Sequence, residues 1–132
     1  MNTPAGATNS GGSTEPRIES LSAITLATHD MPRAVHFYEA LGFPLRFGGP
    51  QAAFTSFALG DGFLNLILDT RAPVAWWGRV IVYVSDVDAL HRKALGAGLQ
   101  PSSEPADAPW GERYFHMTDV DGHEISFAKP LR

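Results

Sequence analysis

Two segments of the chain repeat one pattern of apolar and polar residues. Residues 24–30 read ITLATHD and residues 80–86 read VIVYVSD, so each is an apolar strand that ends at an Asp. After each strand, apolar residues recur at the spacing of a helix. The expected apolar helix faces are Ala34, Phe37, Tyr38 and Leu41 in the first segment, and Val87, Leu90, Ala94 and Ala97 in the second. Asp30 and Asp86 are expected to cap these helices, and Gly42 and Gly98 to end them in the left-handed conformation.

The second part of each segment also repeats. Strands are predicted at 43–47 and near 99–101, and hairpins with Gly/Asp turns at 54–68 and 115–129. Each half, at about residues 20–70 and 78–130, therefore reads β-α-β-β-β. The pattern predicts an α+β fold in which two βαβββ repeats form curled mixed sheets around a cleft, with the helices outside.

Composition narrows the class of protein. The chain has 132 residues, no Cys and a formal charge of −4, which fits one domain over 18–132 after a tail over 1–17 that we expect to be disordered. No apolar run is long enough to span a membrane, and the scattered Lys and Arg residues do not indicate a nucleic-acid partner. Without an export signal, the cytoplasm is the expected location.

Three stretches carry a resemblance to a known family. They read LSAITLATHDMPRAVHFYEALGF, GRVIVYVSDVDAL and WGERYFHMTDVDGHEISF. Together they resemble the vicinal oxygen chelate superfamily, which contains glyoxalase I, bleomycin-resistance proteins, fosfomycin-resistance enzymes and extradiol dioxygenases. The resemblance implies a cleft in which His and Glu residues usually hold a divalent metal ion. The positions that it assigns to metal ligands carry Ala23, Asn65, Arg79 and Ser126 here.

These four residues do not suit a transition metal. Ala has no lone pair, guanidinium is a permanent cation, and neutral oxygens are weaker ligands than imidazole or carboxylate. We therefore expect neither a metal nor another cofactor. A divergent site at His116 and Glu124 would need further ligands, and Glu124 is expected in solvent. His29 and His123 are interpreted as surface or capping residues.

Arg79, His116, Asn65 and Ser126 form a polar set expected in one cleft. Arg79 can clamp a carboxylate, phosphate or enolate, or it can pair internally with Glu112 or an Asp. His116 can act as a general acid–base near neutral pH, or bond to a backbone carbonyl.

Aromatic residues are the second candidate group. Phe63, Trp77, Trp110 and Tyr114 are expected to line the cleft, because flat rings stack on planar ligands. Trp76 can line the cleft as well, or it can cover the core or a subunit interface.

The sequence favours a metal-free protein that binds or sequesters a planar or aromatic small molecule. Metal-free relatives of this type dimerise, which implies a homodimer. Two alternatives stay open. One is a lyase, isomerase or dioxygenase that uses His116 and Arg79, or a divergent metal site. The other is an interaction protein whose cleft is filled.

Overall fold

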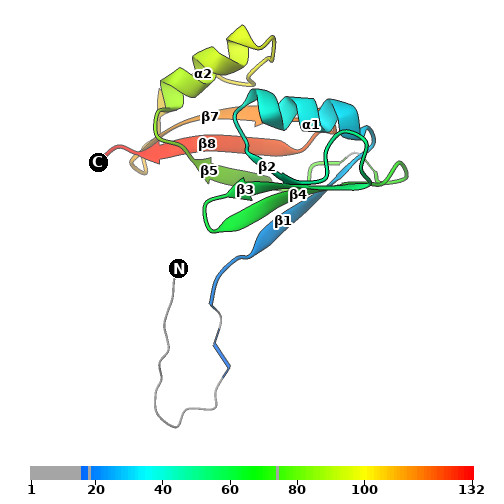
Figure 1. The fold of residues 1–132 in the computed structure, drawn as a ribbon. Helices are drawn as coiled ribbons and strands as arrows, with labels where there is room; N and C mark the ends of the chain where they lie inside the picture. Colours follow the sequence, from blue (N-terminus) through cyan, green and yellow to red (C-terminus); the bar gives the residue numbers. More distant parts are fainter. Residues whose placement is uncertain (1–15, 18, 74) are drawn as a thin grey trace.

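The computed structural model describes residues 16–17, 19–73 and 75–132, and most of the predicted tail lies outside these residues. The helices lie on one side of the sheets (Figure 1). The elements are β1 (Ala23–Thr28), α1 (Met31–Ala40), β2 (Leu45–Phe47), β3 (Phe54–Leu59), β4 (Gly62–Leu68), β5 (Arg79–Tyr83), α2 (Val87–Gly96), β6 (Ala106–Asp107), β7 (Glu112–Thr118) and β8 (Glu124–Pro130). No helix among the described residues is long and apolar enough to cross a membrane.

The two sheets have the same topology, which confirms the predicted repeat. The first sheet has the order β1-β4-β3-β2 and the second has the order β5-β8-β7-β6. In each sheet the first strand of the repeat pairs in parallel with the last strand, and a hairpin supplies the antiparallel pair beside it. The α+β fold with two βαβββ modules is therefore confirmed.

The predicted helix ends are also confirmed. The Asp30 carboxylate accepts the backbone N–H of Arg33 at 3.1 Å, and the Asp86 carboxylate accepts that of Ala89 at 3.0 Å. Gly42 and Gly98 follow the helices with φ of 96° and 82°. These bonds satisfy N–H groups that have no partner within the helix, so both helices begin where the sequence predicts.

The prediction of a strand near residues 99–101 is wrong. The N–H of Leu99 bonds to the carbonyl of Ala94 at 2.9 Å, and that of Gly98 bonds to Leu95 at 3.0 Å. These bonds wrap residue 99 back onto the helix in a Schellman motif, so it cannot begin a strand. The strand of this repeat is β6, only two residues long, and it comes later in the Pro-rich segment. Phe43 makes the equivalent bond to Tyr38 at 3.0 Å, which delays β2 to Leu45.

One core joins the two modules beneath the helices. The rings of Phe43 and Phe127, one from each module, lie 6.2 Å apart. The Tyr38 hydroxyl on α1 donates to the Asp119 carboxylate at 2.6 Å, in the turn between β7 and β8. Burial first, and then the nearby Asp119 carboxylate, raise the pKa of Tyr38 well above its usual value, so the hydroxyl keeps its proton. The helix-facing sides of both sheets are thus used for folding.

Gly42→Ala should lower the free energy of unfolding by about 1–2 kcal/mol, because a β-carbon is unfavourable at this positive φ. Gly96→Ala is the matched control, since Gly96 ends α2 without a positive φ and a β-carbon there would meet open space. Urea denaturation of both variants measures the difference. Equal stability of the two variants would contradict the assigned cap.

Candidate functional site

Strand alternation creates an open face on the second sheet, on the side away from the helices. Val80 and Val82 of β5 point into the core, whereas Arg79, Ile81 and Tyr83 are exposed. Arg79 pairs with Glu124, and Ile81 with Ser126, in the parallel register of β5 and β8. Since paired residues share a side of a sheet, the open face carries most of the predicted site.

His116 and Ser126 lie opposite one another on β7 and β8, on the shared side that the sequence predicts. The His116 Nδ1 atom is 2.6 Å from the Ser126 hydroxyl. Burial, and then the positive charge of Arg79, lower the pKa of His116, while Glu124 opposes this shift. The ring is therefore neutral at pH 7. Its Nε2 atom makes no hydrogen bond to any described residue.

Arg79 forms an internal ion pair, with a partner that the sequence did not indicate. Its Nε and Nη2 atoms donate to one oxygen of Glu124 at 3.1 and 2.7 Å, rather than to Glu112 or an Asp. The Trp76 indole donates to the other Glu124 oxygen at 2.7 Å. The bond from Trp76 is the main cause that lowers the pKa of Glu124, and Arg79 adds to it. The expectation that Glu124 is solvated is wrong, because this strand pairing places its side chain, 19% exposed, beneath two donors.

Three rings form a continuous row on the open face. The Trp110 and Tyr114 rings are stacked, with centroids 5.9 Å apart and an interplanar angle of 27°. The Tyr114 and His116 rings follow at 5.0 Å. At the far end of the row, the Trp110 indole donates to Glu112 at 3.0 Å, and the Tyr83 hydroxyl donates to the other oxygen of that carboxylate. Trp110 remains 69% exposed, so this end of the row is accessible to solvent.

Trp77 and His123 connect the second hairpin to the first module. The Trp77 indole donates to His123 Nδ1 at 2.7 Å, and His123 Nε2 lies 2.7 Å from the Ala27 carbonyl. Because an indole N–H only donates and a carbonyl only accepts, His123 is a neutral ring that carries its proton on Nε2. It bridges the modules, a contact that the sequence did not predict.

The remaining predicted residues lie on the first sheet. The Asn65 amide donates to the Thr25 hydroxyl at 3.2 Å, and within the described ranges no hydrogen bond or ion pair joins Asn65 to the second-sheet group. Phe63 lines a pocket of about 260 Å³ that also includes Ala23 and Ile81. The structure thus places Phe63 near the edge of the second sheet, while Asn65 stays within its own sheet.

Sequence reasoning missed three residues of the open face, although strand parity could have indicated two of them. Trp76, Tyr83 and Glu112 were not assigned to the site, and Glu124 was placed on this face but expected in solvent. Tyr83 has the same strand parity as Arg79, and Glu112 has the same parity as Tyr114 and His116. Strand alternation alone could therefore have placed both on the open face.

The residues at the family's metal positions do not fit a metal ion. The Arg79 guanidinium is bound to Glu124, the Asn65 amide donates to Thr25, and the Ser126 hydroxyl pairs with His116. A cation has no coordinating set among them. Among the residues that the structure describes, no group of three or more His, Asp or Glu side chains is arranged to hold a metal ion.

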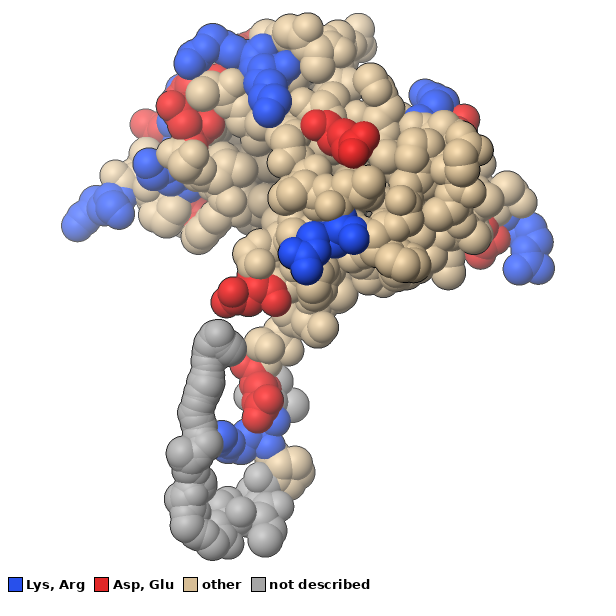
Figure 2. Space-filling view, viewed as in Figure 1, with Lys and Arg blue, Asp and Glu red and all other residues tan. Residues whose placement is uncertain are grey.

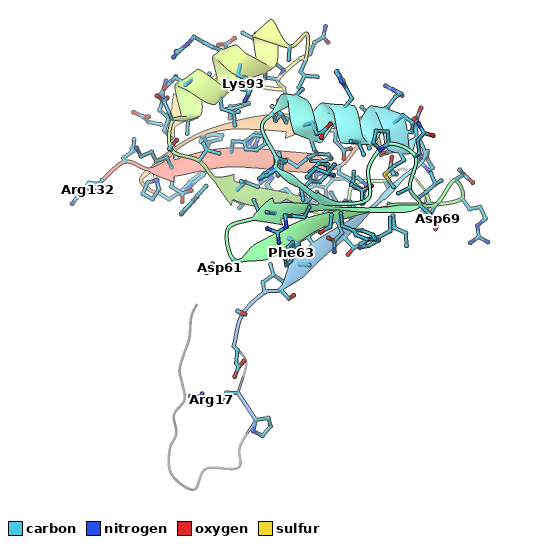
Figure 3. The ribbon with its side chains drawn as sticks, in the orientation of Figure 1. Arg17, Asp61, Phe63, Asp69, Lys93 and Arg132 are labelled. Atoms are coloured by element: carbon cyan, nitrogen blue, oxygen red, sulfur yellow. The ribbon has the colours of Figure 1, made fainter. Side chains whose placement is uncertain are left out.

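Charged residues are scattered over the face of the molecule seen in Figure 2, and Lys and Arg do not gather there into one basic surface. Figure 3 shows that Phe63 and Lys93 lie at opposite sides of the fold, with Phe63 at the first sheet and Lys93 on α2.

The class of protein follows from this fold and from comparison with known proteins. Residues 20–127 match the model of the Glyoxalase/Bleomycin resistance protein/Dioxygenase superfamily. The chain belongs to this superfamily, as its motifs indicated.

Individual relatives agree with that assignment. An uncharacterized protein of Mycolicibacterium smegmatis is 31% identical over 112 residues, which cover 83% of this chain and 92% of the relative. The structure of TioX from Micromonospora sp. ML1 is 30% identical with a TM-score of 0.69, and the match covers 85% of this chain and 99% of that one. A bleomycin-binding protein complexed with bleomycin is 22% identical with a TM-score of 0.67, over 85% of this chain and 98% of that one. This last likeness shows a shared fold.

The charges on the open face predict that two variants shift the pKa of His116 in opposite directions. Arg79→Met should raise the pKa of His116, because a positive charge is removed, and Glu124→Gln should lower it further, because a negative charge is removed. NMR titration of the His116 ring measures both shifts. Shifts of the same sign in the two variants would contradict this account.

The lowered pKa of His116 also determines how this residue makes the free energy of unfolding depend on pH. A ring that resists protonation in the folded state binds fewer protons than it does in the unfolded chain, where its pKa is about 6.5. The contribution of His116 to the free energy of unfolding therefore falls as the pH drops below that value.

Proposed function

We propose that this protein binds a small planar or aromatic molecule on the open face of the second sheet. The row formed by Trp110, Tyr114 and His116 is the observation that carries the proposal. Stacked rings with an exposed end offer a flat apolar surface on which a planar ligand can stack. Trp77, 48% exposed, lies outside this row and donates its indole N–H to His123 in the turn between β7 and β8.

Polar groups along the row would orient the ligand. His116 Nε2 offers one hydrogen bond, while Ser126 holds the ring through Nδ1. Arg79 is neutralised by Glu124, and Glu112 adds a carboxylate at the Trp110 end. The face therefore favours a neutral or positively charged aromatic molecule, and the argument from Arg79 for an acidic ligand loses its force. The bleomycin-binding protein of the same fold, in complex with its ligand, supports binding as the type of function.

A homodimer is part of the proposal. The open face of the first sheet exposes the side chains of Phe54, Phe63 and Ile67, with 37–43% of each accessible, next to Phe47. An apolar group of this kind on a sheet face is typical of an interaction surface. Asn65 and Phe63 would then reach the ligand of a second copy, or support the interface.

An enzymatic function is the second candidate, and the bond between His116 and Ser126 is the observation that favours it. A neutral imidazole with a free Nε2 can accept a proton from a ligand bound on the row. Loss of product formation in His116→Ala at ligand concentrations that saturate the variant would support this lyase or isomerase alternative over simple binding.

Trp110→Ala should weaken binding of a planar cation such as proflavine by roughly five- to tenfold, because one stacking partner worth about 1 kcal/mol is lost. Isothermal titration calorimetry measures the affinity. His36→Ala removes an exposed ring on α1 and is the control that should bind as the wild type does. Unchanged affinity in Trp110→Ala, or failure of planar cations and neutral planar compounds to bind the wild type, would overturn the proposal.

Ile67→Lys should shift the protein from dimer to monomer at micromolar concentration, because a charge would be buried at the interface. Analytical ultracentrifugation measures the assembly. Leu95→Lys is the matched control, since Leu95 is 54% exposed on α2 and lies away from the sheet faces. A wild-type protein that sediments as a monomer over this range would exclude the dimer.

A further inference from the structure

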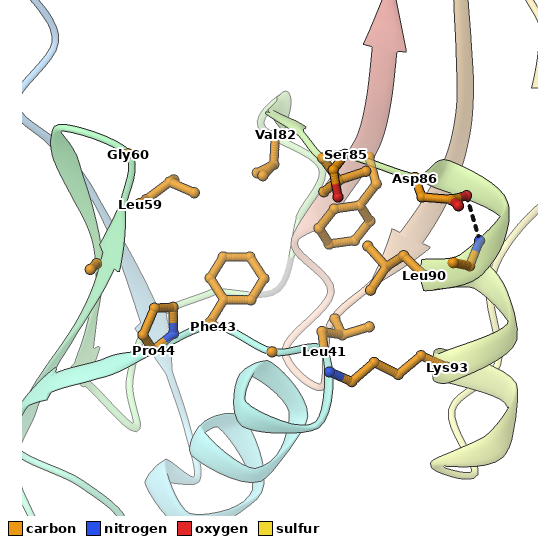
Figure 4. A pocket seen from close by; sticks show the side chains of 15 residues that line it. Leu41, Phe43, Pro44, Leu59, Gly60, Val82, Ser85, Asp86, Leu90 and Lys93 are labelled. Carbon is orange, nitrogen blue, oxygen red and sulfur yellow. Dashed lines mark hydrogen bonds between the residues drawn. The ribbon is translucent and has the colours of Figure 1, made fainter.

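A separate pocket of about 450 Å³ lies between the two modules on the helix side of the sheets. Figure 4 shows it between the end of α1, the start of α2 and the strands that carry Leu59 and Val82. Val82 and Phe127, which line it, point to the helix side of the second sheet. The pocket is therefore distinct from the open face, whose residues project in the opposite direction.

The body of this pocket is apolar, and both modules build it. The apolar side chains that line it include Leu41, Phe43, Leu59, Val82, Leu90 and Phe127. Four of them are at least nine-tenths buried, so the hollow reaches down to the shared core. Its volume is in the range of small-ligand pockets, which combine apolar walls with a few polar groups.

The charged side chains of the pocket are not equivalent. The Asp86 carboxylate caps α2 by accepting the Ala89 N–H at 3.0 Å. The Lys93 ammonium, by contrast, makes no ion pair or hydrogen bond with any residue that the structure describes. In Figure 4 the Lys93 side chain runs along the pocket, and its ammonium end lies beside Leu41.

Gly42 allows this placement of the ammonium. The Lys93 Nζ atom lies 3.1 Å from the position that a β-carbon on residue 42 would occupy. The left-handed cap thus leaves room for a cation at the mouth of an apolar hollow. A cation above apolar walls is complementary to an amphipathic anion.

We propose that this pocket binds a small amphipathic carboxylic acid. The apolar chain lies between the modules against Phe43, Leu90 and Phe127, and the carboxylate pairs with Lys93. The site is independent of the planar-ligand site, because the two use opposite sides of the sheets. A bound acid touches both modules and therefore stabilises their packing.

Octanoate is the probe, and calorimetry of the full chain measures its binding. Lys93→Met keeps the length of the side chain and removes its charge, and it should weaken octanoate binding at least tenfold. Arg92→Met is the matched control, because Arg92 is an exposed cation on the same helix that does not line the pocket. Ala89→Phe, which fills the pocket, should abolish binding, and octanoate should raise the melting temperature of the wild type.

Several outcomes would overturn the proposal. The proposal is wrong if octanoate does not bind the wild type. It is also wrong if octanoate binds Lys93→Met and the wild type equally, which is the result expected if Lys93 only stabilises the end of α1. Stronger binding of octylamine than of octanoate would assign the pocket to cations through Asp86 instead. Octanoate binding that is lost in Trp110→Ala would place the acid on the open face. Because Trp110 does not line this pocket, failure here leaves the planar-ligand proposal intact.

Discussion

The hydrogen bond from Tyr38 to Asp119 is the constraint on which the open face depends. The Asp119 carboxylate accepts the Tyr38 hydroxyl through one oxygen and the N–H groups of Asp121 and His123, each at 2.9 Å, through the other. All three bonds lie in a turn that is largely covered, where an unpaired carboxylate would be costly. α1 of the first module thereby holds the turn from which His123 and Glu124 project.

The two modules share one backbone plan but have different open faces. In both, alternate strand residues pack beneath a helix, which leaves the other side of each sheet available. The first sheet presents Phe54, Phe63 and Ile67 there, and the second presents an ion pair and stacked rings. Since the core is shared on the helix side, these outward residues can change without loss of the fold.

The helix boundaries and hairpins were predictable because they depend on neighbours in the chain. Capping by Asp30 and Asp86, and the left-handed turns at Gly42 and Gly98, require only local geometry. The strand near residue 99 was not predictable in this way. Leu99 completes the helix cap, and the Pro-rich segment after it moves the short pairing with β7 to Ala106.

The sequence by itself determined the repeat, the helix ends, and the side of the sheet on which Arg79, His116 and Ser126 lie, because strand alternation and hairpin register are local properties. Only the tertiary structure decided how these groups are paired. Glu124 lies 45 residues from Arg79 and 48 from Trp76, yet it bonds to both. Contacts across such distances depend on how the strands assemble, and they convert an apparent anion receptor into a neutral pair beside a row of aromatic rings.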